Sequence, residues 1–226
     1  MSNITENWFY RLSEFKADKI TIENDLIVSL FDDLNNNLDI EIWENARVEF
    51  YSILEDREDF RINFIQNKQK SDLKVNYLLL SKDNIKLKAK IYSELSADFV
   101  KSDVQIISII WNDWFIDLDW IIQINEWIKK VDANLVEDNL FIGNTWKIKW
   151  IPTLLVRSDD VKASHACKME RISDEKLFYL RSRGIDKENA LSVMIEAKIK
   201  SLFLCISMLD NDFYEELIEE TLEKIK

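Results

Sequence analysis

Apolar and polar side chains alternate along several short runs of this sequence, and the runs return about every 10 to 15 residues. Because successive side chains of a β-strand point to opposite faces, each run predicts a strand with one buried face. Short strands at such a spacing are typical of sandwiches, barrels and solenoids. The clearest runs are Leu38–Ile42, Ile62–Phe64, Leu73–Leu79, Ile85–Ile91 and Ile116–Ile124, and polar breaks are expected at Asp32–Asn37, Asn67–Asp72, Ser81–Asn84 and Glu137–Asn139.

The scarcity of glycine favours one of these three folds. The chain has two glycines, Gly143 and Gly184, and neither follows Asn or Asp. Tight two-residue hairpins prefer the dipeptides Asn-Gly and Asp-Gly, whereas wide polar corners between the coils of a solenoid do not need them. Periodicity alone fits all three folds, but the missing turn dipeptides favour a solenoid.

The apolar residues follow a helical period from Ser173 onward. One helix is expected over Asp174–Arg183, with Ser173 as its N-cap and Gly184 just beyond its C-terminus. Asp186 can cap a second helix that continues to Met208. Its expected apolar stripe consists of Ala190, Val193, Met194, Ala197, Ser201, Leu204, Cys205 and Met208.

Two further segments have a helical pattern. Residues 212–224 are expected to form a third C-terminal helix with an acidic, solvated outer face. At the other end of the chain, Thr5–Lys16 places Trp8, Leu12 and Phe15 on one face at helical spacing.

Charge and composition exclude several classes of protein. The net charge of −12 would repel phosphate backbones, so nucleic-acid binding is not expected. The most apolar windows, such as Ile106–Ile110, are far shorter than the roughly 20 residues that span a bilayer. Met1–Lys16 lacks the apolar segment of a secretory signal. We therefore expect no membrane association and a location in the cytoplasm or an equivalent organelle stroma.

The C-terminal part of the chain contains an unbroken, highly specific run. This run is Leu177-Phe178-Tyr179-Leu180-Arg181-Ser182-Arg183-Gly184-Ile185, and Asp159-Asp160-Val161, Ser164-His165 and Asp174-Glu175 come before it. Together these residues resemble the C-terminal signature of the SufB/SufD family of iron–sulfur cluster assembly proteins. The Ser164-His165 pair is most similar to the SufD branch. A weaker similarity extends upstream, so that about the last 100 residues are covered.

This resemblance implies a mainly β fold, a right-handed parallel β-helix (a β-solenoid) with a short N-terminal helix and a C-terminal helical segment. The expected divisions are 1–30 for an N-terminal helical or capping segment, 31–172 for the β-helix core and 173–226 for the helical segment. The chain is shorter than typical members of the family.

The resemblance also implies a role rather than a reaction. In the family, SufB and SufD pair through their β-helices, and each holds a SufC ATPase on its C-terminal helices. We therefore expect a SufD-like scaffold subunit, not an enzyme, with a SufB-like protein and a SufC-like ATPase as partners, or a homodimer when alone. No tightly bound cofactor is expected, only a transient iron–sulfur cluster shared with the partner chain.

Two residues are candidates for the cluster chemistry. His165 is the only histidine and occupies the position of the SufD histidine that the resemblance assigns to cluster assembly. Cys167 follows two residues later, so in a strand both side chains point to the same face. Cys167 is the weaker candidate, because the family does not place a cysteine there. The plainer interpretations are a structural histidine and a buried free thiol.

The resemblance assigns partner binding to the first C-terminal helix. The candidate residues are Phe178, Tyr179, Arg181, Arg183 and Gly184. The two arginines have a second interpretation, since cations near a helix C-terminus also compensate the helix dipole.

Two alternative functions stay open. The chain could be a degenerate β-helix that binds partners without a direct role in cluster chemistry. It could also be a carbohydrate-active β-helix enzyme, in which Asp159 and Asp160 would act as paired carboxylates. Adjacent strand residues face opposite ways, however, and Asp favours corners, so a structural corner is the better interpretation of that pair.

Overall fold

The computed structural model describes residues 1–15, 17–34, 36–55, 59–81, 86–111, 114–142, 146–171 and 174–225. Within them, two seven-stranded sheets form, and every pairing between neighbouring strands is parallel. The strands are β1 (Ser2–Ile4), β2 (Phe9–Arg11), β3 (Lys19–Ile22), β4 (Ile27–Asp32), β5 (Leu38–Ile42), β6 (Arg47–Glu55), β7 (Phe60–Gln66), β8 (Asp72–Ser81), β9 (Lys86–Leu95), β10 (Lys101–Ile110), β11 (Trp114–Ile124), β12 (Lys129–Phe141), β13 (Trp146–Val156) and β14 (Asp160–Arg171).

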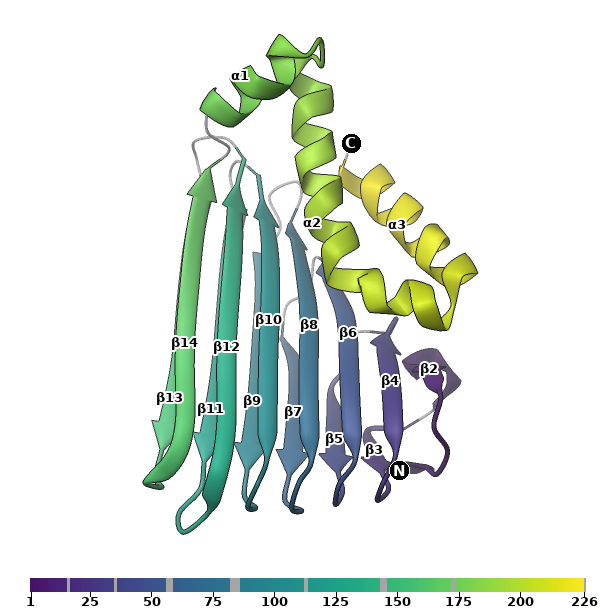
Figure 1. The fold of residues 1–226 in the computed structure, drawn as a ribbon, viewed down its shortest axis with the longest axis vertical. Coiled ribbons are helices and arrows are strands. Elements are labelled where there is room, and N and C mark those ends of the chain that lie inside the picture. Colours follow the sequence, from purple (N-terminus) through teal and green to yellow (C-terminus); the bar gives the residue numbers. More distant parts are fainter. Residues whose placement is uncertain are drawn as a thin grey trace.

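Consecutive strands alternate between the two sheets. The first sheet has the order β1-β3-β5-β7-β9-β11-β13, and the second has the order β14-β12-β10-β8-β6-β4-β2. Each coil of the chain therefore adds one strand to each sheet, and the coils stack along one axis (Figure 1). This arrangement confirms the expected parallel β-helix.

Inward-facing side chains fill the lumen, which is the space between the two sheets. The alternating residues that the sequence predicts as buried are buried, including Leu73, Val75 and Tyr77 on β8 and Leu118 and Trp120 on β11. Ile85, which was also expected in a strand, lies outside the described residues. The period-two pattern therefore identified the lumen side of these strands correctly.

One expected polar break is wrong. Glu137 and Asn139 lie inside β12 and are buried there, rather than forming a corner. They continue the inward series of Val131, Ala133 and Leu135. The strand register decides their position, because a polar side chain at an inward position of a long strand still points into the lumen.

At the corners between coils, residues other than glycine adopt the positive φ angles that glycine usually provides. Five residues, one in each of five successive corners, have a positive φ between 58° and 65°; they are Asp25, Asn45, Lys70, Phe99 and Trp127. Four of them donate their backbone N–H to a carbonyl of the next coil, as Asn45 does to Gln69 over 3.0 Å. These hydrogen bonds between coils offset the conformational cost of about 1–2 kcal/mol that a non-glycine residue has in this region.

The N-terminal segment contains less helix than its pattern indicated. Phe9–Arg11 form β2, which pairs with β4, and only Leu12–Glu14 form a single 3₁₀ turn. The buried Leu12 packs on the lumen core. Pairing with the neighbouring coil therefore prevails over the helical spacing of Trp8, Leu12 and Phe15.

Three helices follow the strands in the described part of the chain. They are α1 (Asp174–Ser182), α2 (Lys187–Leu209) and α3 (Asn211–Ile225). Gly184 has φ +87° and its N–H donates to the Arg181 carbonyl, which confirms its place beyond the end of α1. The side chain of Asp186 accepts from the Asn189 N–H and caps α2 as expected, whereas Ser173 lies outside the described residues. None of the described helices has a length and apolarity sufficient to span a membrane.

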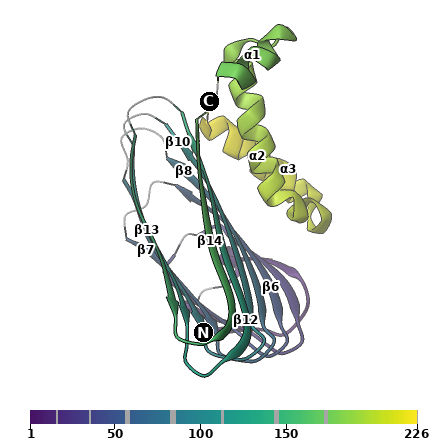
Figure 2. The same cartoon turned by 60° about the vertical axis from the view of Figure 1, so that its left-hand side comes forward.

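Helices α2 and α3 cover part of the outer face of the second sheet and create a second core there (Figures 1 and 2). Phe203 on α2 lies at its centre, with its ring 6.4 Å from the ring of Phe31 and 6.2 Å from that of Tyr51. Beside this core, Lys198 of α2 bonds Asp138 of β12. The helices are therefore fixed to the sheet by both apolar and ionic contacts.

The expected stripe of α2 is only partly correct. Ala190 is buried and Cys205 is partly buried against the second core, but Val193, Leu204 and Met208 are exposed. The buried face is instead formed by Ala190, Ile195, Ile199, Leu202, Phe203 and Ile206. Because α2 is apolar around most of its circumference, the sequence could not show which side faces the sheet.

The second core gives a stability prediction. Phe203→Ala should lower the free energy of unfolding by about 3–5 kcal/mol, because it removes a fully buried ring between the helix and the sheet. The control is Leu204→Ala, the next residue, whose side chain is 52% exposed and should change stability by less than about 1 kcal/mol. Urea unfolding of both variants measures the difference. Equal losses for the two variants would contradict this packing of α2.

Candidate functional site

The last coil of the β-helix leaves an open end. In the described part of the chain, β13 and β14 are the terminal strands of their sheets, and each pairs with a neighbour on one side only. Both are long, with 11 and 12 residues. Figure 2 shows their edges facing away from the rest of the solenoid. A long edge strand offers a row of backbone N–H and C=O groups with which another strand can pair.

His165 and Cys167 lie on β14 and face the lumen at this open end. His165 is in register with Leu135 of β12, and Cys167 is in register with Glu137. Since Leu135 and Glu137 are buried inward-facing residues, the two residues beside them on the next strand share that orientation. Among the described residues no further strand pairs with the outer edge of β14, and both residues are exposed at the end of the lumen.

A buried carboxylate lies beside both side chains. Glu137 is 1% exposed, and its Oε1 is 3.4 Å from Nε2 of His165. Asn139, also 1% exposed, directs its Nδ2 to Sγ of Cys167 over 3.6 Å. An imidazole, a thiol, a carboxylate and an amide from two adjacent strands therefore meet at the mouth of the lumen.

The environment keeps the Cys167 side chain in its thiol form. Burial raises the pKa of Cys167 first, and then the Glu137 carboxylate raises it further by accepting a hydrogen bond from the thiol and by its charge. The hydrogen bond from the Asn139 amide lowers the pKa of Cys167 and so opposes these two effects. A metal ion bound at this thiol would have to displace a proton, which makes binding dependent on pH.

The mouth of the lumen also has a small cavity next to His165. It is lined by Ile122, Leu135, Pro152, Thr153, Leu154, Ser164 and His165. Across the described residues, no group of three or more His, Cys, Asp or Glu side chains already has the arrangement of a metal site. Further ligands or a movement of side chains would be needed to enclose an ion here.

The residues expected to bind a partner lie on a different element. Phe178 and Tyr179 of α1 are 72% and 57% exposed, and the Arg183 guanidinium lies 4.9 Å from the centre of the Tyr179 ring. Arg181 and Phe178 line a shallow pocket with Glu175, Leu177 and Lys187. Gly184 ends this helix. The candidate residues thus form two groups, one on β14 and one on α1.

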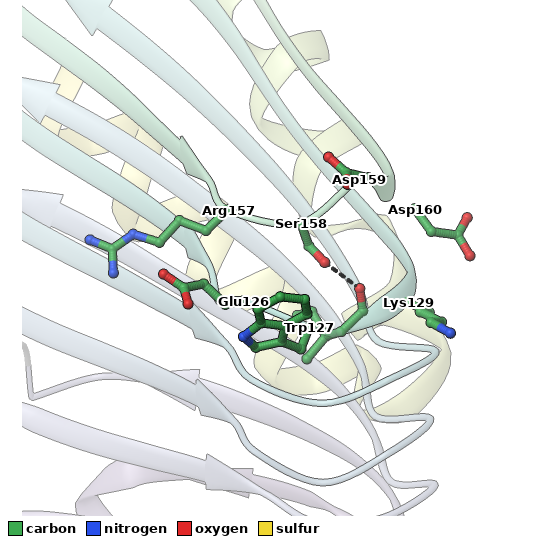
Figure 3. A pocket seen from close by; sticks show the side chains of 8 residues that line it. Glu126, Trp127, Lys129, Arg157, Ser158, Asp159 and Asp160 are labelled. Carbon is green, nitrogen blue, oxygen red and sulfur yellow. Dashed lines mark hydrogen bonds between the residues drawn. The ribbon is translucent and has the colours of Figure 1, made fainter.

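The Asp159–Asp160 pair lies at the corner between β13 and β14, as a structural interpretation requires. Oδ2 of Asp160 lies 3.4 Å from Nζ of Lys130. Both aspartates line a corner pocket together with Trp127 and Arg157. Figure 3 shows the two carboxylates pointing in different directions. They therefore do not converge on one reacting atom, as the paired carboxylates of a glycosidase do.

Sequence reasoning did not find Glu137 and Asn139. The alternation of β12 could have identified them, because positions 137 and 139 continue the inward series 131, 133 and 135. The sequence predicts a polar corner at this segment, since three polar residues in succession are typical of one. Only the register with β14 brings Glu137 beside His165 and Cys167.

Comparison with known proteins identifies the family to which this chain is similar. Residues 36–198 match the family model described as the SufBD core domain of SUF-system FeS cluster assembly. The iron–sulfur cluster assembly protein SufD of Escherichia coli is 30% identical over 131 residues, which cover 58% of this chain and 31% of that protein.

Two relatives of the same family match shorter segments. The SufBD family protein ycf24 of Antithamnion is 34% identical over 65 residues, 29% of this chain and 22% of that protein. The chloroplastic SufBD family protein ABCI8 of Arabidopsis thaliana is 32% identical over 66 residues, 29% of this chain and 12% of that protein. The chain thus spans less than a third of the length of each of these curated relatives. The matched core domain, which includes most of the β-helix and the strand that carries His165, shows that the chain belongs to the SufB/SufD family of iron–sulfur cluster assembly proteins.

Proposed function

We propose that this chain is a SufD-like scaffold subunit that works with a SufB-like protein and a SufC-like ATPase in the cytoplasm or an organelle stroma. Family membership supports a role in iron–sulfur cluster assembly. The observation that carries the finer proposal is the open end of the β-helix, where His165 and Cys167 lie at inward positions of β14 and are exposed to solvent. In this proposal the chain positions ligands and partners, and the ATPase reaction belongs to another chain.

Pairing through the β-helix would use the edges of β13 and β14. A partner β-helix placed end to end can continue both sheets, because each edge has unpaired backbone groups along its length. It would also cover the cavity beside His165 and exclude water from it. A second copy of this chain has the same edge, so a homodimer is expected when the SufB-like protein is absent.

The cluster itself would be cargo rather than a resident cofactor. Imidazole nitrogen and thiolate sulfur both bind iron, and His165 and Cys167 supply one of each. Because two ligands cannot hold a cluster, a partner chain would supply the others. Assembly at the junction of two open ends follows from that requirement.

Docking of the ATPase would use α1. Phe178 and Tyr179 are large aromatic side chains that solvent reaches, and arginines lie beside them. Aromatic residues and arginine are the types most often found at the energetic centre of protein interfaces. This surface is on a different element from the β-helix edge, so one subunit could hold both partners at once.

The role of His165 can be tested in the assembled complex. The chain should co-purify with the SufB-like and SufC-like proteins of its own organism, both as wild type and as His165→Ala. After anaerobic reconstitution, the variant complex should retain iron at least about tenfold more weakly, because one ligand is lost. Iron and sulfide contents of the two complexes measure the effect. Normal complex formation with unchanged iron and sulfide would show that the chain is only an interaction module.

The two docking surfaces should be separable. Phe178→Glu should abolish binding of the SufC-like ATPase but leave pairing with the SufB-like protein intact, because a charge replaces an exposed interface ring. Trp127→Glu is the control, since Trp127 is 90% exposed at a corner of the solenoid and is not part of α1. Size-exclusion chromatography of the mixtures reports both interactions. Loss of ATPase binding in the Trp127 variant, or its retention in the Phe178 variant, would contradict the assignment.

A further inference from the structure

Trp127 is exposed to an unusual degree for a large apolar side chain. It is 90% exposed, the highest value among the large apolar side chains of the described residues. It also has a positive φ of 65°, which is unfavourable for a residue with a Cβ atom. At four earlier corners, such a residue donates its backbone N–H to the next coil, but Trp127 has no such bond within the described ranges. Strain that the local structure does not offset is typical of residues that bind a ligand or partner.

The next corner along the chain is shorter and leaves a pocket beside the indole ring. Residues 125–128 connect β11 to β12, whereas residues 157–159 connect β13 to β14. The pairing of β12 with β14 also skips Lys130, which makes a β-bulge at the base of the longer corner. The corner pocket has a volume of about 330 Å³, and the Ser158 hydroxyl joins the two corners by donating to the Ile128 carbonyl (Figure 3). Ligand sites usually have volumes of roughly 300–1,000 Å³.

The carboxylates of the corner pocket indicate the charge of its occupant. Asp160 is paired with Lys130, but the carboxylates of Glu126 and Asp159 have no ion pair or hydrogen bond among the residues that the structure describes. Both line the pocket, and Figure 3 shows the Glu126 carboxylate beside the indole of Trp127. An indole face and an unpaired carboxylate both attract a cation. The pocket is therefore suited to a positively charged side chain.

Two cations in the same pocket favour a peptide over a free ion. Arg157 and Lys129 line the pocket and extend to opposite sides of the indole in Figure 3. They would repel an inorganic cation, but each can donate hydrogen bonds to the backbone carbonyls of an extended peptide. The net charge of −12 would also attract a basic segment from a distance. A peptide with basic side chains thus matches both the carboxylates and the cations of the pocket.

We propose that the corner pocket docks a basic, extended peptide segment of a partner protein. A lysine or arginine side chain of that segment lies over the indole of Trp127 and against the carboxylates of Glu126 and Asp159. The pocket belongs to the corners of the solenoid, not to α1 or to the edge of β14. This inference therefore goes beyond the proposed function and does not rest on it.

Fluorine NMR of the chain labelled with 5-fluorotryptophan can locate the binding. The chain has eight tryptophans, and Trp127→Phe assigns the Trp127 signal by its loss. The probe is the terminally blocked peptide Gly-Arg-Gly-Lys-Gly, which should shift the Trp127 signal saturably. The signal of Trp8, which is 70% exposed and does not line the pocket, should not shift. A peptide with glutamate in place of both basic residues should leave both signals unchanged.

Substitutions test the contacts that the proposal names. Glu126→Gln and Asp159→Asn should each raise the dissociation constant of the fluorescein-labelled basic peptide about two- to fivefold, as measured by fluorescence anisotropy. Glu216→Gln on α3 is the matched control and should have no effect. All three acids are exposed, so the fold should be retained. A missing Trp127 shift, an equal shift of Trp8, equal binding of the acidic peptide, or unchanged affinity in both pocket variants would overturn the proposal.

Discussion

Parallel stacking of coils is the constraint from which the rest of this structure follows. Every inner coil buries its inward face and satisfies its backbone groups on two neighbours, whereas the last coil has a neighbour on one side only. The inward side chains of β14 are therefore exposed, although their counterparts on β12 are buried. The same geometry that makes the core creates the open end, and reactive side chains at lumen positions become accessible there and nowhere deeper.

The helices are tied to the strand next to this end. Lys198 of α2 bonds Asp138, which lies on β12 between Glu137 and Asn139. Asp138 faces the helices while its two neighbours face the lumen, because side chains alternate along a strand. Anything that shifts α2 on the sheet would act on the strand that carries the buried half of the site. Helix α2 and the buried lumen residues Glu137 and Asn139 are thus joined through one short segment of β12.

The sequence was sufficient to predict the architecture, but it did not predict which residues meet at the candidate site. Alternation identified inward residues such as Val75 and Trp120, and cap chemistry identified Gly184 and Asp186, because these features depend on local geometry. The buried face of α2 could not be chosen, since Leu202 and Leu204 are equally apolar and only the sheet decides between them. Glu137 could not be placed beside His165, because their contact depends on the register of strands separated by a whole coil.

The central claim is that a partner binds the open end of the β-helix, and hydrogen–deuterium exchange tests it most directly. Backbone amides of β14 and β13 should exchange rapidly where they lack a neighbouring strand and become protected when the SufB-like protein is added. Amides of β1 and β2, at the other end of the solenoid, should be unchanged. Protection confined to β1 and β2, or no protection at all in a mixture that forms a stable complex, would contradict the account.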